Sequence, residues 1–153
     1  MTPRTTAAPL SGAPAPVAPA PVAPAPVAPI SDGYRRAGIA AHAADDKNGD
    51  DVVVLDVGDI LSIAEAFVMV SASNTRLVRT IVDEVELSLK LSDDEAPRSV
   101  EGLGDATWVL MDYGDVIVHV FLGETRAFYD LDRLWADAPV VDWEPLAPLA
   151  ERV

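Results

Sequence analysis

The chain has 153 residues, half of them hydrophobic, and it carries a formal net charge of −14 at pH 7. This is enough chain and enough apolar surface for one domain with a packed core, which excludes disorder throughout. Because the sequence contains no cysteine, disulfides and thiolate metal sites are excluded as well.

The charge is unevenly distributed along the chain. All 25 acidic residues follow residue 30, whereas Arg4 is the one basic residue before it, so residues 31–153 carry a net charge of −15. A surface of this sign repels phosphate backbones, which argues against direct nucleic-acid binding, and it would be attracted to a basic protein. High solubility or adaptation to a salty cytoplasm would explain the same charge, and the charge alone favours that simpler explanation.

The sequence gives no signal for a membrane. No apolar run reaches the roughly 18 residues that a spanning helix needs. Arg4 is not followed by the apolar block of a secretory signal. We therefore expect a cytoplasmic protein.

Residues 1–30 are rich in proline and alanine. The pentapeptide Ala-Pro-Ala-Pro-Val occurs three times in succession over residues 13–27. Proline fixes φ and removes a backbone donor, so we expect this extension to be disordered, with polyproline II character. A spacer is the role that we favour from the sequence, and a ligand for a proline-binding groove, which would make the chain an adaptor, is the alternative.

The first predicted helix covers residues 33–47. Ser31 and Asp32 are candidate N-caps, and Asn48-Gly49 is a natural helix stop. Small apolar residues would form its buried side, and we expect His42 to be a surface residue.

Two strands and a long helix should follow. Residues 52–57 are nearly all apolar and β-branched, which is typical of a strand covered on both faces, and residues 66–72 form the next strand. Ser73 and Asn74 are candidate N-caps of a helix that extends to about Lys90. Its apolar residues fall on one stripe, which predicts that it lies on the sheet.

The next segment is predicted to be a loop, then a hairpin and a short helix. Residues 92–105 are polar and contain proline and glycine, so they should hold at most a short strand. A Gly-Asp turn separates residues 109–111 from residues 116–122, which is a hairpin signal. Gly123 to Arg126 breaks the pattern. Apolar residues then recur at helical spacing at Phe128, Leu131, Leu134 and Trp135.

This order of elements predicts a compact α/β domain with a mixed β-sheet flanked by helices. We divide the chain into the extension at 1–30, the domain at 31–138 and an irregular C-terminal tail at 139–153, where three prolines forbid a continuous helix.

Acidic residues near the hairpin raise the question of catalysis. Asp112, Asp115 and His119 could in principle bind a divalent metal or transfer protons. However, strand alternation places His119 beside apolar neighbours, and Asp115 is an ordinary turn residue. A metal-dependent nucleotidyltransferase that uses the two carboxylates is therefore the weaker alternative, and we expect no metal or cofactor.

The hairpin also carries a family resemblance. W-V-L-M-D-Y-G-D-V-I-V-H-V-F, followed by R-x-F-Y-D-L-D-R-L-W, resembles the signature of the ribosomal silencing factor family, also called RsfS or Iojap. Upstream, Asp56-Val57, residues 62–67 and residues 70–76 are similar to that family's first strands and first turn. The resemblance covers roughly residues 30–139.

The resemblance implies a fold and a function. The fold would be a relative of the nucleotidyltransferase fold that works without catalysis. The protein would bind the large ribosomal subunit through ribosomal protein uL14, block joining of the small subunit and repress translation when nutrients are short. Family members commonly form homodimers.

The residues that match the family most specifically are the candidate partner contacts. They are Trp108, Asp112, Asp115, His119, Arg126 and Tyr129. Among them Arg126 and Tyr129 are the leading candidates, because these residue types are favoured at interface centres. The two aspartates are expected to pair with basic residues of the partner, and most of the aromatic residues are expected in the core.

Overall fold

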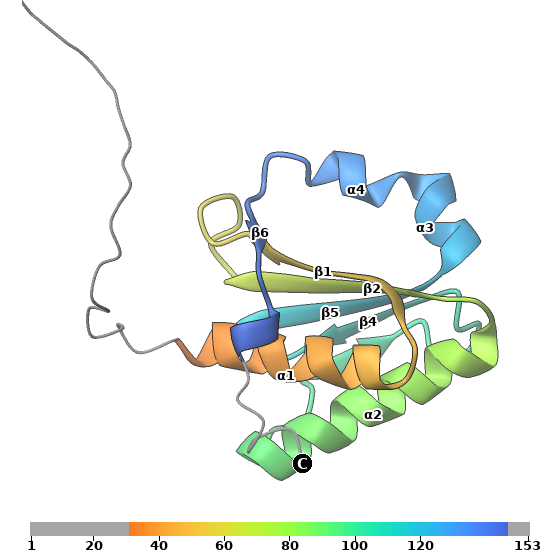
Figure 1. Cartoon of the computed structure of the whole chain (residues 1–153), viewed down its shortest axis with the longest axis horizontal. Helices are drawn as coiled ribbons and strands as arrows, with labels where there is room; N and C mark the ends of the chain where they lie inside the picture. Colours follow the sequence, from red (N-terminus) through yellow and green to blue (C-terminus); the bar gives the residue numbers. More distant parts are fainter. Residues whose placement is uncertain (1–30, 147–153) are drawn as a thin grey trace, which may run out of the picture.

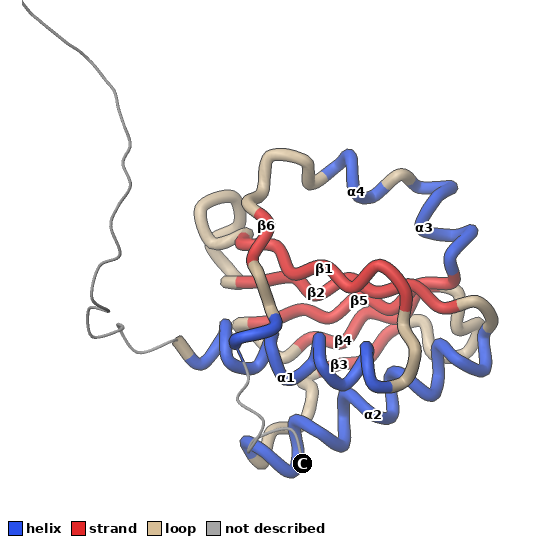
Figure 2. Tube along the Cα trace, viewed as in Figure 1, coloured by secondary structure: helices blue, strands red, loops and turns tan. Residues whose placement is uncertain are grey.

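The computed structural model describes residues 31–146, whose strands form a six-stranded mixed sheet with helices on both faces (Figures 1 and 2). Residues 1–30 and 147–153, and with them the expected proline-rich extension, lie outside the described residues. Across the sheet the strand order is β3-β4-β5-β2-β1-β6. The strands are β1 (Asp50–Asp56), β2 (Ala66–Ala72), β3 (Ser99–Glu101), β4 (Trp108–Asp112), β5 (Val116–Leu122) and β6 (Val140–Val141).

The centre of the sheet is a parallel pair. β2 and β5 pair in register from Ala66 opposite Val116 to Ala72 opposite Leu122, and the other strand pairs are antiparallel. All seven residues of β2 are buried, because strands flank it on both edges and side chains cover both of its faces. The α/β fold with a mixed sheet, and the 66–72 and 116–122 strands, are confirmed.

Two helices cover one face of the sheet. α1 (Asp32–Asp46) begins where the Ser31 hydroxyl accepts a hydrogen bond from the backbone N–H of Tyr34. α2 (Thr75–Asp93) begins where the Asn74 side chain accepts one from the N–H of Leu77 at 2.8 Å. The predicted apolar stripe of α2 is buried: it consists of Val78, Ile81, Val82, Val85 and Leu89.

His42 corrects the sequence-based expectation, because it lies inside rather than on the surface. A 3-10 turn, η1 (Glu144–Leu146), folds back onto α1, and the His42 Nε2 atom lies 2.9 Å from the backbone oxygen of Glu144. The Trp143 ring meets the His42 ring edge-on at 4.8 Å. Part of the predicted irregular tail thus packs on the domain, through this turn and through the pairing of β6 with β1.

The segment after β5 also differs from the prediction. Gly123 to Arg126 does not interrupt the structure but forms the start of α3 (Gly123–Tyr129), and a second short helix, α4 (Leu131–Leu134), follows. Asp130 separates them with φ of 51°, a left-handed conformation that ends one helix and redirects the chain. Because the chain changes direction at Asp130, the apolar residues at helical spacing do not share one buried face. Leu131 is buried, whereas Phe128 and Leu134 are exposed.

Candidate functional site

The two faces of the β4–β5 hairpin are covered differently. One face supplies side chains to the core beneath α1 and α2, namely Val109, Met111, Val116, Val118 and Val120. The other face belongs to a smaller core cluster that includes Phe67, Phe121 and Leu131, with Trp108 and Ile117 packed at its margin. Figure 1 shows α3 and α4 on this second side of the sheet, where they extend beyond β2 and β1. On this face Phe121 and His119 are buried, whereas Trp108 and Ile117 are only partly buried.

Trp108 and His119 form a hydrogen-bonded pair on the second face. The Trp108 Nε1–H donates to His119 Nδ1 at 3.2 Å, so Nδ1 has no proton and the neutral ring carries its proton on Nε2. The ring of His119 stacks on Phe121 with centroids 5.8 Å apart and lies 4.8 Å from that of Phe67. Burial lowers the pKa of His119 to about 4, so the imidazole is neutral at physiological pH. Its Nε2 atom is buried without a hydrogen-bond partner among the described residues.

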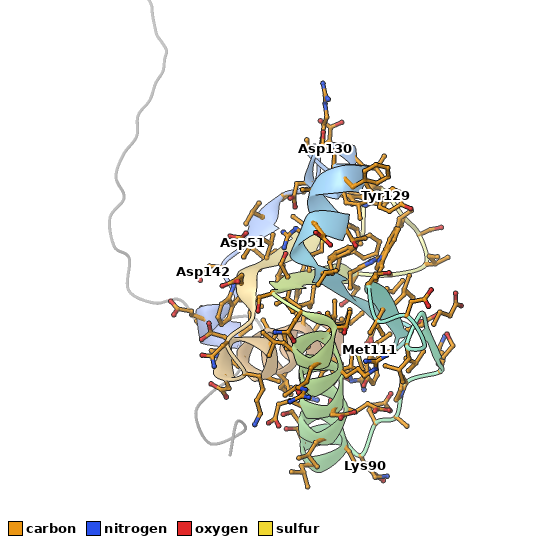
Figure 3. The ribbon with its side chains drawn as sticks, turned by 90° about the vertical axis from the view of Figure 1, so that its right-hand side faces the viewer. Asp51, Lys90, Met111, Tyr129, Asp130 and Asp142 are labelled. Atoms are coloured by element: carbon orange, nitrogen blue, oxygen red, sulfur yellow. The ribbon has the colours of Figure 1, made fainter. Side chains whose placement is uncertain are left out.

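α3 places two aromatic side chains next to this pair. Tyr129 packs on Trp108 at a centroid distance of 5.6 Å, and Phe128 meets the Tyr129 ring edge-on at 5.0 Å. Phe128 is 80% exposed and Tyr129 is 55% exposed, although most aromatic residues were expected in the core. Figure 3 shows Tyr129 at the end of the molecule opposite Lys90 of α2.

Two hollows meet at Trp108. One, of about 430 Å³, is lined by Thr107, Trp108, Glu124, Thr125, Phe128 and Tyr129. The other, of about 300 Å³, is lined by Glu101, Gly102, Trp108 and Leu110. We call the two together the aromatic groove. Its walls are largely apolar, and Glu101 and Glu124 are its two acidic residues.

Arg126 is buried and holds α3 against the sheet. Its guanidinium donates to the backbone oxygen of Asp51 and to the Ser71 hydroxyl, both at 2.9 Å, and it pairs with the Asp132 carboxylate at 3.0 Å. The side chain also lies over the Phe121 ring, 6.0 Å from its centroid. With 5% of its surface exposed, Arg126 lies in the interior, where its guanidinium already has partners within the chain.

The two aspartates of the hairpin turn have partners within the chain. The Asp112 carboxylate accepts a hydrogen bond from the Gly114 N–H at 2.8 Å, which stabilises a turn in which Gly114 has φ of 91°. The Asp115 carboxylate pairs with Arg36 of α1 at 2.7 Å, and Arg36 also pairs with Asp93 of α2. Within residues 31–146 no group of three or more acidic or histidine side chains could hold a metal.

Comparison with known proteins identifies the family to which the chain belongs. The family model described as "Ribosomal silencing factor during starvation" matches residues 31–152. The chain belongs to the ribosomal silencing factor family. A silencing factor from Bacillus subtilis is 38% identical over 68% of this chain and 87% of its own length, and one from Halalkalibacterium halodurans is 40% identical over 69% and 90%.

The chain is also similar to a mitochondrial protein and to a solved structure. The mouse protein named "Mitochondrial assembly of ribosomal large subunit protein 1" is 29% identical over 58% of this chain and 40% of its own length. A crystal structure of a protein from Chromobacterium violaceum matches with a TM-score of 0.66 and 29% identity, covering 69% of this chain and 88% of that one. The expected family is thus confirmed.

The structure brings together three of the six residues expected to bind a partner. Trp108, His119 and Tyr129 adjoin one another at the aromatic groove, whereas Asp112 and Asp115 lie at the turn and Arg126 lies beneath α3. The sequence reasoning did not select Phe128, Leu110 or the two groove glutamates. Within the described residues, no helix is long and apolar enough to cross a bilayer.

Proposed function

We propose that the chain binds the large ribosomal subunit through ribosomal protein uL14, blocks association of the small subunit and represses translation under nutrient limitation, in the cytoplasm. The observation that carries this proposal, beside family membership, is the aromatic groove. It exposes Phe128 and Tyr129 next to Trp108, on a protein whose residues 31–153 carry a net charge of −15.

The groove has the composition of an interface centre. Large aromatic anchors supply most of the binding energy at such centres, and a polar rim excludes water around them. Glu101 and Glu124 provide acidic groups in the lining, which suits a basic partner. A domain bound to the subunit-joining surface prevents association sterically, so the proposed mechanism needs no bond chemistry and the protein is not an enzyme.

The residues selected from the sequence take different parts in this proposal. Tyr129 and Trp108 contact the partner, while Arg126 and His119 position them from beneath. Asp112 remains a candidate to pair with a basic residue of the partner. Asp115 contributes mainly to the fold, because its carboxylate already forms an ion pair with Arg36 of α1.

Self-association of the free protein is part of the same proposal. Several large apolar side chains are exposed on the second side of the sheet, away from the groove, in the loop before β2 and in α4 and β6: Ile60, Ile63, Leu134 and Val140. Burying such residues against a second copy would remove apolar surface from water. We therefore propose a homodimer when the chain is not on the ribosome.

The test is the variant Tyr129→Ala. Truncating a central interface tyrosine commonly costs about 2 kcal/mol, or roughly a thirtyfold loss of affinity. We expect this loss in co-sedimentation with purified large subunits, with subunit joining restored in a reconstituted system. The matched control is Leu91→Ala, which removes an exposed side chain from α2.

The melting temperature of both variants is measured in parallel. Because Tyr129 is more than half exposed, its truncation should lower the melting temperature little. A folded Tyr129→Ala protein that still binds large subunits with wild-type affinity would rule out the aromatic groove as the ribosomal contact.

A further inference from the structure

The proline repeats of residues 13–29 have a spacing that the proposed function does not use. They contain three Pro-x-x-Pro motifs, at residues 16–19, 21–24 and 26–29. A polyproline II helix has three residues per turn, so the two prolines of each motif lie on the same side, about 9 Å apart. Segments of this kind are recognised by grooves lined with aromatic side chains.

The aromatic groove has the features that such a segment needs. Trp108 stands between two adjoining hollows, so prolines on either side of it could each fill one. Phe128 and Tyr129 line one of these hollows together with Trp108, and their rings are nearly perpendicular, with an interplanar angle of 86°. Their exposed faces would pack against proline rings, which bury apolar surface with little loss of conformational entropy.

The charges of the proline-rich extension and of the domain also favour docking of the extension in the groove. Residues 1–30 contain no acidic residue and one basic residue, Arg4, whereas residues 31–153 carry a net charge of −15. Glu101 and Glu124 lie in the groove itself. The extension is therefore attracted to the domain rather than repelled by it.

Chain length decides which motif can reach the groove. β5 runs from Val116, next to the Asp115 that binds α1, to Leu122, next to the groove, which is about 20 Å at the rise of a strand. With the first turn of α1 and the passage around the sheet edge added, the path from Ser31 is roughly 35–40 Å. At about 3.1 Å per residue, residues 21–29 fall short of the groove and residues 13–19 reach it.

We propose that residues 13–19 of this chain dock in its own aromatic groove as a polyproline II segment. Docking covers Trp108, Phe128 and Tyr129, so the extension competes with the partner for this surface. That competition rests on the proposed function, whereas docking does not. Weak contacts are sufficient, because a short tether gives an effective concentration in the millimolar range.

Docking is tested on the full-length chain with a synthetic peptide of residues 13–29. The peptide is titrated into the wild type and into a variant with Pro14, Pro16 and Pro19 replaced by Ala, while the NMR signals of the Trp108 indole N–H and the Tyr129 amide are followed. We expect the variant to bind the peptide at least tenfold more tightly, because its groove is open. The matched control replaces Pro24, Pro26 and Pro29 and should behave as the wild type.

A groove variant completes the test. Phe128→Ala, which removes an exposed side chain, should abolish peptide binding in the background of the three substitutions. Two results would overturn docking of the extension in its own groove. One is that the peptide causes no NMR shifts in the Pro14, Pro16 and Pro19 variant, and the other is that the wild type and this variant bind the peptide with equal affinity.

Competition between the extension and the ribosomal partner is measured separately, as the affinity of each variant for large subunits. The Pro14, Pro16 and Pro19 variant should bind large subunits several-fold more tightly than the wild type, and the control variant should not. Unchanged affinity in a variant whose groove binds the peptide would overturn the competition. Failure of the wild type and both variants to bind large subunits would instead refute the proposed function and leave the docking result standing.

Discussion

The two faces of the sheet are built from alternate residues of the same strands, yet they are covered differently. Beneath α1 and α2 the interior is a continuous layer of alanine, valine, isoleucine and leucine, and Ala40, Val54 and Ile81 are fully inaccessible to solvent. On the other face two short helices cover part of the sheet. There the aromatic rings of Phe67, Phe121 and Trp108 surround His119, and Phe128 is left at the surface.

The difference indicates that the first face mainly stabilises the fold, whereas the second face has side chains exposed to a partner. Close packing under two capped helices removes most of the apolar surface of the first face from water, which stabilises the fold. The second face is stabilised by a smaller apolar cluster, by contacts between aromatic rings and by the buried Arg126. Its exposed side chains remain available to a partner, so substitutions on the two faces should have different consequences.

The largest effect should come from the first face. Ile81→Ala removes a fully buried side chain from α2 and should lower the free energy of unfolding by about 3 kcal/mol, because it leaves a cavity. Leu87→Ala on the same helix is the control, and its exposed side chain should contribute less than about 0.5 kcal/mol. Urea denaturation measures both. Equal losses would contradict the assignment of α2 to the core.

Arg126→Met should have the largest effect on the second face. It leaves the Asp51 carbonyl and the Ser71 hydroxyl without their donor, which should cost about 2–3 kcal/mol in unfolding free energy. Arg133→Met is the matched control, because its guanidinium is exposed and pairs with Asp130 at 3.5 Å. If Arg126→Met weakens subunit binding without destabilising the protein, the arginine contacts the partner after all.

Acid should affect the second face through His119. The folded protein binds a proton on His119 with a pKa of about 4, against 6.5 for the free side chain, so stability is full above pH 6.5 and is lost as pH falls toward 4. The loss between pH 7.5 and pH 5 is about 2 kcal/mol in unfolding free energy.

The variant His119→Asn isolates this contribution. Its unfolding free energy, from urea titrations at each pH, should change less than that of the wild type over the same range. The difference between the two pH profiles gives the contribution of His119 alone, because His42 is present in both proteins. Parallel pH profiles for the two proteins would show that His119 is not buried in the neutral form.

Acid should affect the first face at lower pH. Burial of Asp93 opposes its ionisation, but its hydrogen bonds and ion pairs with Arg35 and Arg36 outweigh burial and lower its pKa. A lowered carboxyl pKa contributes stability that is present above about pH 4 and is lost below it. The two faces should therefore lose stability in separate pH windows.

The smallest effect concerns the whole surface. A net charge of −15 on residues 31–153 should accelerate encounter with a basic partner. Raising the ionic strength from about 0.05 M to 0.5 M should slow association roughly tenfold, because salt screens this attraction. Stopped-flow binding measures the rate, and the dissociation rate serves as the internal control. An association rate independent of salt would argue against charge steering.

Local patterns predicted the first face almost completely. The N-caps at Ser31 and Asn74 and the apolar stripe of α2 are signals within one turn of helix, and the structure has them as predicted. The second face was predicted less well. Nothing local shows that Asp130 adopts a left-handed conformation. The exception on the first face is His42 of α1, because no local signal shows that η1 returns to bury it.

The sequence by itself determined the α/β order and the strands at 66–72 and 116–122, because periodicity, caps and turn residues act over a few positions. The family followed from the resemblance of the hairpin segment to the family signature, and the family model confirms it. The tertiary structure alone decided which residues of the signature reach the surface. Arg126 and Tyr129 are three positions apart in one short helix, and one is buried while the other is exposed. That outcome depends on where the carbonyl of Asp51 and the hydroxyl of Ser71 lie, and long-range packing places both.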